Sequence, residues 1–164
     1  MENVNELFDD YSIIVDGSDN FPTRYLINDA CVLFEKVLIH GSIHKFHGQV
    51  AVFNYRKGPT YRCLFPEPPS SDALPNCSEI GVLGVLPGII GSLQALETIK
   101  VITGVGDILS GKVLTYDALL QKTTLLTLSP QAENRQITEL VSQSESCSNS
   151  EGDPNEITEL EPDE

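Results

Sequence analysis

The sequence is poor in basic residues, and this scarcity argues against several classes of partner. Ten Lys and Arg stand against 24 Asp and Glu, for a formal net charge of −14. Residues 129–164 hold ten of the acids and one base, which leaves fourteen acids, nine bases and a net charge of −5 in residues 1–128. A mildly acidic body offers little electrostatic attraction to nucleic acid or to anionic lipid. We therefore expect no nucleic acid and no membrane among its partners.

Long apolar runs and export features are also lacking. The longest charge-free apolar run, residues 80–96, is interrupted by glycines, a proline and a glutamine. It falls short of the roughly 18 clean apolar residues of a membrane span. Residues 1–6 are acidic where a secretory signal would begin with basic residues. The four cysteines have irregular spacings, so the sequence predicts reduced thiols in a cytoplasmic protein.

Hydrophobic patterning predicts an α/β fold. A β-branched strand, a helix and a second strand in succession form a βαβ unit, whose two strands are parallel. A stretch with four prolines predicts a crossover loop. The expected elements are strands at 11–15 and 37–40, a strand pair at 41–46 and 49–55, a last pair at 112–116 and 123–128, helices over about 22–34 and 88–103, and the loop at 66–75.

The second predicted helix carries a face of small residues. Gly88, Gly91, Ser92 and Ala95 follow one another at helical spacing, so a partner backbone can come very close there. Two interpretations stay open. The helix packs on its own sheet, which we favour, or it forms a subunit contact.

Acidic and amide side chains gather where the first strand meets the first helix. Asp16, Asp19 and Asn20 follow the strand, and Pro22 stands near the start of the helix. Open α/β folds bind ligands at the carboxyl ends of their strands. Mg²⁺ takes one or two carboxylates together with phosphate oxygens, so the two acids suit a magnesium–nucleotide complex. The two acids suit equally well a structural role, in which they cap the following helix and complement its dipole.

Six segments together carry a resemblance to a known family. They are residues 16–31, 48–53 (Gly-Gln-Val-Ala-Val-Phe), 61–66 (Tyr-Arg-Cys-Leu-Phe-Pro), 76–85 (Asn-Cys-Ser-Glu-Ile-Gly-Val-Leu-Gly-Val), 88–100 and the closing Tyr-Asp-Ala at 116–118. This joint pattern resembles the ThiF/MoeB/HesA family, the ubiquitin-activating-like adenylyltransferases of sulfur-carrier proteins. The resemblance covers about residues 3–128.

The resemblance implies a fold and an activity. The fold is a Rossmann-like mixed sheet, the C-terminal half of a ThiF-type domain over residues 1–128. The composition of residues 129–164 separately predicts an acidic, disordered tail or linker. The activity is ATP-dependent adenylylation of the C-terminal glycine of a ubiquitin-like sulfur-carrier protein, for molybdopterin or thiamin biosynthesis. The implied cofactors are ATP and Mg²⁺, and the full-length form is expected to be a homodimer.

The resemblance also implies roles for particular residues. Asp19 matches the aspartate that holds magnesium with ATP, and Asp16 and Asn20 beside it are expected to bind the cofactor. Asp16 matches a position that the family varies. Arg24 matches an arginine near the acyl-adenylate. Cys77 follows the proline-rich loop, where some relatives place a cysteine that bonds covalently to the carrier or its sulfur. Alternatively, Cys77 packs when the loop closes.

Two departures from the family pattern affect these expectations. Many relatives bind zinc through two Cys-x-x-Cys pairs, but here Cys63 lacks its partner and no second pair follows. Since a structural zinc site needs four ligands, we expect none, and His40, His44 and His47 are not expected to supply one. The chain also has no G-x-G-x-x-G opening a helix. We expect the family's phosphate-binding loop to lie upstream, and this chain to lack autonomous ATP binding.

Two rival functions remain at this point. One is a noncatalytic fragment that dimerises or binds a carrier protein. The other is half of a dinucleotide-binding oxidoreductase, since related sheets host both chemistries. Hydride transfer needs neither the Asp19 and Arg24 pair nor the Cys77 loop, which argues against the oxidoreductase.

Overall fold

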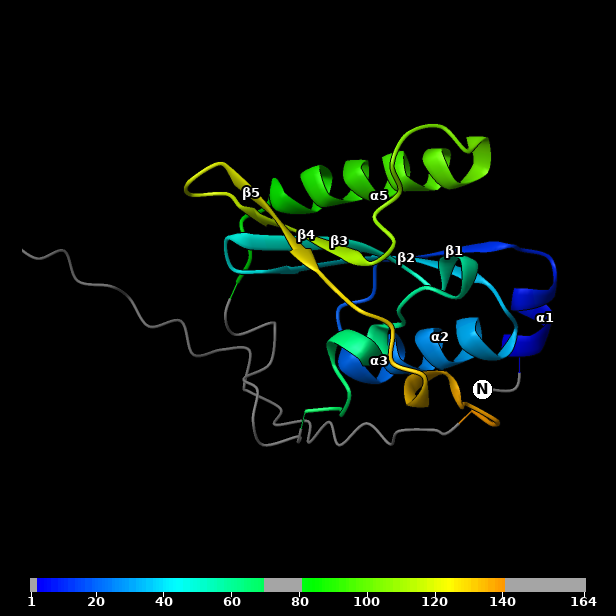
Figure 1. Ribbon diagram of the computed structural model, residues 1–164. Helices are drawn as coiled ribbons and strands as arrows, with labels where there is room; N and C mark the ends of the chain where they lie inside the picture. Colours follow the sequence, from blue (N-terminus) through cyan, green and yellow to red (C-terminus); the bar gives the residue numbers. More distant parts are fainter. Residues whose placement is uncertain (1–2, 70–80, 141–164) are drawn as a thin grey trace, which may run out of the picture.

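A five-stranded sheet lies between two layers of helices in the computed structural model, which describes residues 3–69 and 81–140. Helix α5 covers one face of the sheet, and α2 and α3 cover the other (Figure 1). The elements in chain order are α1 (Val4–Asp9), β1 (Ile13–Asp16), α2 (Phe21–Leu33), β2 (Val37–His44), β3 (His47–Phe53), η1 (Tyr55–Lys57), α3 (Tyr61–Leu64), α5 (Leu86–Thr103), β4 (Lys112–Asp117), β5 (Lys122–Thr127) and η2 (Glu133–Arg135).

The sheet is mixed, with strand order β1-β2-β3-β4-β5. Strand β1 pairs in parallel with β2, so that Asp16 stands beside His40, and the other three pairings are antiparallel. The parallel pair follows from α2, because a helical crossover returns the chain to the same end of the sheet. The predicted α/β fold with a Rossmann-like mixed sheet is confirmed.

Local sequence explains where the two long helices begin and end. The Asn20 side chain caps α2 by accepting a hydrogen bond from the Thr23 backbone N–H at 2.9 Å, and Pro22 occupies the first turn. Helix α5 ends at Gly104, whose φ of 69° lies in the left-handed region that glycine adopts without strain. Both predicted helices are confirmed within a few residues.

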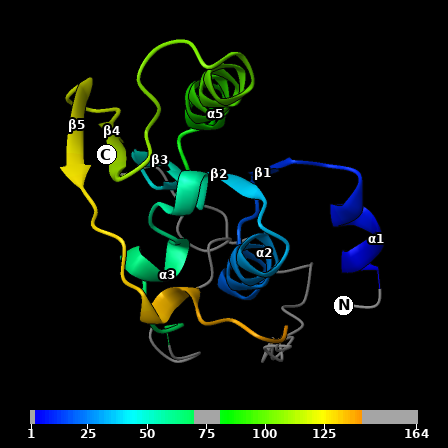
Figure 2. The same cartoon turned by 45° about the vertical axis from the view of Figure 1, so that its right-hand side comes forward.

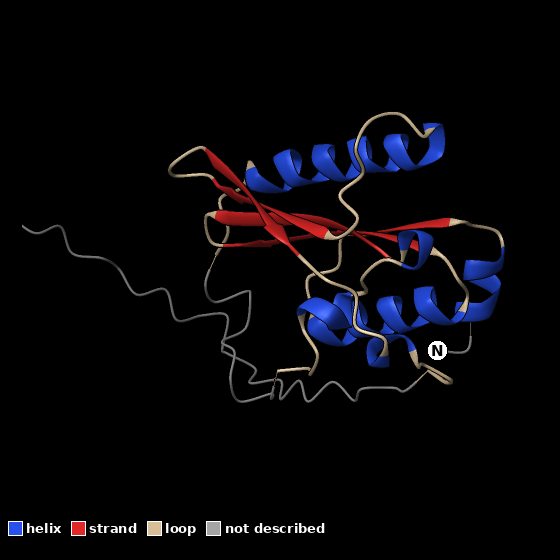
Figure 3. Cartoon of the chain, in the orientation of Figure 1, coloured by secondary structure: helices blue, strands red, loops and turns tan. Residues whose placement is uncertain are grey.

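Figure 3 shows helices on both faces of the sheet. A hydrophobic core lies on each of these faces. Because side chains alternate along a strand, neighbours in β2 and β3 enter different cores. Leu38 and Phe53 pack toward α2 and α3, whereas Ile39 and Val52 pack toward α5. A fully buried side chain of this size contributes roughly 1.5–3 kcal/mol. The two cores therefore fix the layers that surround the β1–α2 loop.

The structure corrects two details of the predicted element order. The predicted strands at 37–40 and 41–46 are one continuous strand, β2, because its first half pairs with β1 while residues 38–44 pair with β3. Helix α1 was not predicted; it places Phe8 in the core beside Phe34, with ring centroids 6.1 Å apart. The predicted crossover loop lies partly outside the described residues.

The chain continues to contact the body beyond residue 128. Figure 2 shows the segment after β5 running down toward α3. Asn134 donates to the Arg62 carbonyl at 3.0 Å, and Arg135 donates to the Gly58 carbonyl and to Asn54 Oδ1, each at 2.7 Å. The domain boundary at residue 128 stays a prediction. None of the described helices has the length and apolarity needed to cross a membrane.

Candidate functional site

A cavity of about 400 Å³ opens at the β1–α2 loop, on the side of the sheet that α5 covers. The loop, the middle of β2, the start of α5 and one residue of α2 line this cavity. Its lining residues are the polar Ser18, Asp19, Arg24, Ser42 and Gln94, the apolar Ile43, Val82, Pro87 and Ile90, and the glycines Gly17, Gly41 and Gly91. The cavity thus lies at the carboxyl end of β1, where open α/β sheets bind ligands.

The structure brings two of the predicted site residues, Asp19 and Arg24, to this cavity. Arg24 donates from Nε and Nη2 to the Ser18 carbonyl, at 3.2 and 3.0 Å, and its guanidinium lies 5.4 Å from the centre of the Phe21 ring. These contacts fix the arginine against the loop. A carboxylate and a guanidinium therefore line one opening, an arrangement that suits a metal-bound, anionic ligand.

Asn20 does not line the cavity. Its Oδ1 caps α2, and its Nδ2 donates to Asp19 Oδ1 at 3.3 Å. Of the three polar residues at the corner, Asn20 is the one that provides the N-cap of the helix. Its contribution to cofactor binding stays a prediction, and its observed contact with the site is the hydrogen bond to Asp19.

Asp16 lies behind the loop and is buried. Its Oδ1 accepts the Ser18 backbone N–H at 2.9 Å, and its Oδ2 lies 3.0 Å from His40 Nδ1. Burial raises the pKa of Asp16, but the hydrogen bonds from His40 and Ser18 outweigh it and lower the pKa overall. Burial lowers the pKa of His40, against the opposing effect of Asp16. The pair is therefore an ionised carboxylate that accepts from a neutral imidazole. The cofactor-binding role of Asp16 stays a prediction.

Gln94 is a cavity residue that the sequence analysis did not single out. From α5, its Nε2 donates to the Asp16 carbonyl at 2.7 Å and to the Ile39 carbonyl at 3.2 Å. Gly41 makes room for it, since a Cβ at that position would lie 2.3 Å from Gln94 Cδ. The available signal was a polar amide within an otherwise apolar helical stretch.

The remaining predicted residues lie elsewhere. Cys77 lies outside the described residues. Cys63 is buried in α3, where its Sγ accepts from the Thr60 and Gln131 backbone N–H groups at 3.3 and 3.4 Å. Burial raises the pKa of Cys63, but these and further hydrogen bonds outweigh it and lower the pKa overall.

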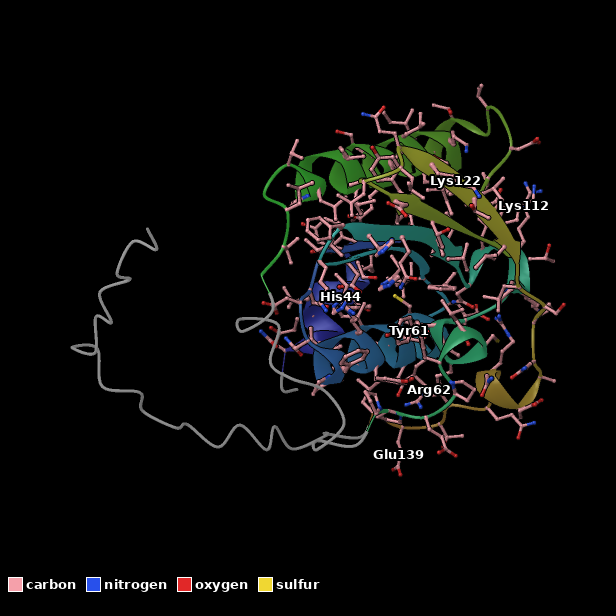
Figure 4. All side chains as sticks on the ribbon, turned by 90° about the vertical axis from the view of Figure 1, so that its left-hand side faces the viewer. His44, Tyr61, Arg62, Lys112, Lys122 and Glu139 are labelled. Carbon is pink, nitrogen blue, oxygen red and sulfur yellow. The ribbon has the colours of Figure 1, made fainter. Side chains whose placement is uncertain are left out.

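The three histidines and the nearby acids are spread over the fold. Figure 4 shows His44 at the end of β2, and Tyr61 between the sheet and the layer that holds α2 and α3. His47 lies 3.9 Å from Asp117 at the surface, whereas His40 is buried with Asp16. Within residues 3–69 and 81–140, no group of three or more His, Cys, Asp or Glu side chains is placed to hold a metal ion by itself. The cavity carboxylate of Asp19 suits Mg²⁺ that arrives with phosphate oxygens, because Mg²⁺ needs only one or two protein carboxylates.

Sequence comparison relates the chain to carrier-activating proteins. The family model described as "ThiF family" matches residues 1–139. A sulfur carrier protein adenylyltransferase of Thermus thermophilus is 54% identical over 123 residues, which cover 72% of this chain and 45% of that protein. The adenylyltransferase and sulfurtransferase MOCS3 of Aedes aegypti is 44% identical over 154 residues, which cover 90% of this chain and 35% of that protein. The chain therefore spans less than half the length of these relatives.

Solved structures share the fold. A crystal structure of E. coli MccB with ATP matches with a TM-score of 0.61 at 15% identity, over 78% of this chain and 41% of that chain. At such an identity the likeness concerns the fold alone. The family match, in contrast, runs through the sheet, both helical layers and the loop that lines the cavity. On this basis, the chain belongs to the ThiF family.

Proposed function

We propose that this chain supplies part of the active site for ATP-dependent adenylylation of a carrier protein. The substrate is the C-terminal glycine of a ubiquitin-like sulfur carrier, of the molybdopterin or thiamin biosynthesis type, in a cytoplasmic setting. The observation that carries the proposal is the cavity at the carboxyl end of β1, which Asp19 and Arg24 line together. The names of the relatives support the choice of substrate.

The proposed reaction joins two anions, so it needs positive charge around the phosphates. The carrier carboxylate attacks the α-phosphorus of ATP, a new carboxyl–phosphate bond forms, and pyrophosphate leaves with the electron pair of the broken bond. Arg24 is proposed to stabilise the anionic acyl-adenylate, because its guanidinium is fixed at the cavity by the Ser18 carbonyl. Asp19 would hold Mg²⁺ bound to ATP, which neutralises phosphate charge. Asn20 would assist through its hydrogen bond to Asp19 Oδ1, and the buried Asp16 would support the loop from behind.

We propose that this chain supplies only some of the groups that the reaction needs. It has no G-x-G-x-x-G segment to bind phosphates through backbone N–H groups, and it spans less than half the length of its relatives. We therefore expect adenylylation only when residues beyond these 164 complete the nucleotide site. Without them, the chain is proposed to be inactive.

The decisive experiment is carrier-dependent exchange between ATP and labelled pyrophosphate, run on this chain and on a form extended upstream. We expect exchange in the extended form alone. Asp19→Ala should abolish this exchange, and Arg24→Ala should reduce it strongly. Asp107→Ala, which removes an exposed carboxylate outside the cavity lining, is the matched control and should leave the rate unchanged. Full exchange by the Asp19→Ala protein would refute the proposal.

Cys77 is proposed to accept the activated carrier or its sulfur through a covalent bond. The Cys77 thiolate would attack the carbonyl carbon of the acyl-adenylate, a thioester would form, and AMP would leave. The test is whether Cys77→Ser abolishes a conjugate with the carrier that a thiol reagent releases. An unchanged yield of conjugate from the Cys77→Ser protein would remove this role.

A second candidate function is a noncatalytic fragment that dimerises or binds a carrier without ATP. The outer face of α5 favours it, because Leu96, Ile99 and Ile102 are 50%, 57% and 69% exposed. A helix that is apolar all round is normally covered by another surface. The same face supports a homodimer in the full-length form. Carrier binding without exchange in either form of the protein would favour this second function.

A further inference from the structure

A buried acid–imidazole pair stands directly behind the cavity. Asp16 at the end of β1 and His40 in β2 are 2% and 1% exposed, and Asp16 Oδ2 lies 3.0 Å from His40 Nδ1. The His40 ring packs against Tyr61 and Phe53, with centroids 5.0 and 5.8 Å away. His40 Nε2 has no hydrogen-bond partner among the described residues. The imidazole thus donates from Nδ1 and leaves Nε2 as a bare acceptor in an aromatic environment.

A chain of hydrogen bonds connects this pair to the cavity. Asp16 Oδ1 accepts the Ser18 N–H at 2.9 Å, and the Ser18 carbonyl accepts both bonds from Arg24. Asp19, the cavity carboxylate, is the next residue along the backbone. The Ser18 peptide groups are therefore held between Asp16 on one side and Arg24 on the other. Rotation of the loop backbone at Ser18 would shift Asp19 and release Arg24.

The carboxylate of Asp16 is already engaged in these contacts. Its two carboxylate oxygens face His40 and Ser18, and the backbone carbonyl of Asp16 accepts a hydrogen bond from Gln94 at 2.7 Å. A neutral amide in its place could not accept from both donors, because one of its two polar atoms is itself a donor. The pair is therefore suited to hold the loop in one conformation.

We propose that Asp16 and His40 are positioning residues, which act through the Ser18 peptide groups to hold Asp19 and Arg24 at the cavity. This inference rests on the proposed function for its catalytic consequence. It differs from a direct role of Asp16 in binding the nucleotide, because the pair sets the shape of the loop without touching the ligand. It also assigns a role to His40, which stands in the middle of a strand and was not predicted to belong to the site.

Two substitutions of His40 separate its hydrogen bond from its packing. His40→Asn keeps an N–H donor near the position of Nδ1. His40→Phe keeps a ring against Tyr61 and Phe53 but removes the donor. Asp16→Asn keeps the shape of the carboxyl group but loses one acceptor. The first readout is hydrogen exchange of the Ser18 amide in this chain, measured by NMR, with strand amides of β4 as the reference for overall folding.

We expect His40→Phe and Asp16→Asn to speed exchange of the Ser18 amide by about tenfold, as the loss of one ordinary hydrogen bond implies. His40→Asn should stay close to the parent protein. In the upstream-extended form, His40→Phe should raise the KM for Mg·ATP by about tenfold while kcat changes less. The KM of the His40→Asn protein should stay close to that of the parent protein.

Three results would overturn the inference. The Ser18 amide could remain fully protected from hydrogen exchange in the His40→Phe protein. The His40→Asn protein could show the same faster exchange as His40→Phe although both are folded. Alternatively, Asp16→Asn could lose ATP affinity while His40→Phe keeps it, which would put Asp16 on the ligand itself. If neither form of the parent protein exchanges ATP with labelled pyrophosphate, the proposed function fails. Hydrogen exchange of the Ser18 amide would still test whether Asp16 and His40 position the loop.

Discussion

The stability of this protein should fall in mildly acidic solution because of His40. The side chain is 1% exposed, and burial lowers its pKa below the ordinary value of 6.5. Below pH 6.5 the unfolded chain binds a proton at this residue that the folded chain excludes. The unfolded state therefore binds more protons, and the free energy of unfolding decreases as the pH falls. Asp16 acts in the same direction, but its stabilisation is lost only below its ordinary pKa of 3.8.

The size of the effect follows from one proton. If His40 stays neutral in the folded state throughout, acidification from about pH 7.5 to about pH 5.5 removes at most about 1.4 kcal/mol of stability. The small exposure of His40 means that solvent screening reduces this figure little. Most of the loss should occur below pH 6.5, and almost none should occur above pH 7.5.

Urea unfolding followed by far-UV circular dichroism measures this loss. The comparison is His40→Asn, which keeps the hydrogen bond to Asp16 but cannot titrate in this range. Every other titrating side chain is common to both proteins, so the difference between their pH dependences belongs to His40. The parent should lose about 1 kcal/mol more than His40→Asn over this range. Equal pH dependences would refute a buried, neutral His40.

Three further predictions concern other contacts. Gln94→Leu should lower the free energy of unfolding by about 1–3 kcal/mol, because two backbone carbonyls lose a donor; urea titration measures this, and an unchanged midpoint would contradict it. Arg62→Leu removes two hydrogen bonds of 2.7 Å to the buried Asp29, so we expect the free energy of unfolding to fall by about 2 kcal/mol. The exposed control Lys122→Leu should leave the free energy of unfolding unchanged in the same urea titration. Ile99→Lys should weaken any self-association seen in sedimentation yet leave stability within about 0.5 kcal/mol; undiminished association would argue against α5 as the contact.

Local signals in the sequence were sufficient for most of the fold. The helix over about 22–34 was predicted with a proline near its start, and Pro22 does occupy the first turn of α2. The alternative of helix capping was raised for Asp16 and Asp19, whereas the residue at the N-cap is Asn20. The break expected at Gly41 was wrong. A glycine in a strand can mark an interruption or a close approach of another group. Here β2 continues through Gly41 because residues 38–44 pair with β3, and the missing side chain leaves room for Gln94 of α5. That contact joins residues 53 positions apart, so no local pattern contains it.

By itself, the sequence determined the α/β elements, the loop and helix start that carry Asp19 and Arg24, and the resemblance to a family. The elements follow from short-range chemistry, namely strand and helix periods and turn residues, and the resemblance rests on motifs that are local in the chain. Only the tertiary structure decided what surrounds that loop. Asp16 turned toward His40, and Gln94 reached across from α5, because a buried carboxylate and buried carbonyls must find donors wherever packing brings them. Partners of that kind come from other elements of the fold, and their distance along the chain hides them from any reading of the sequence alone.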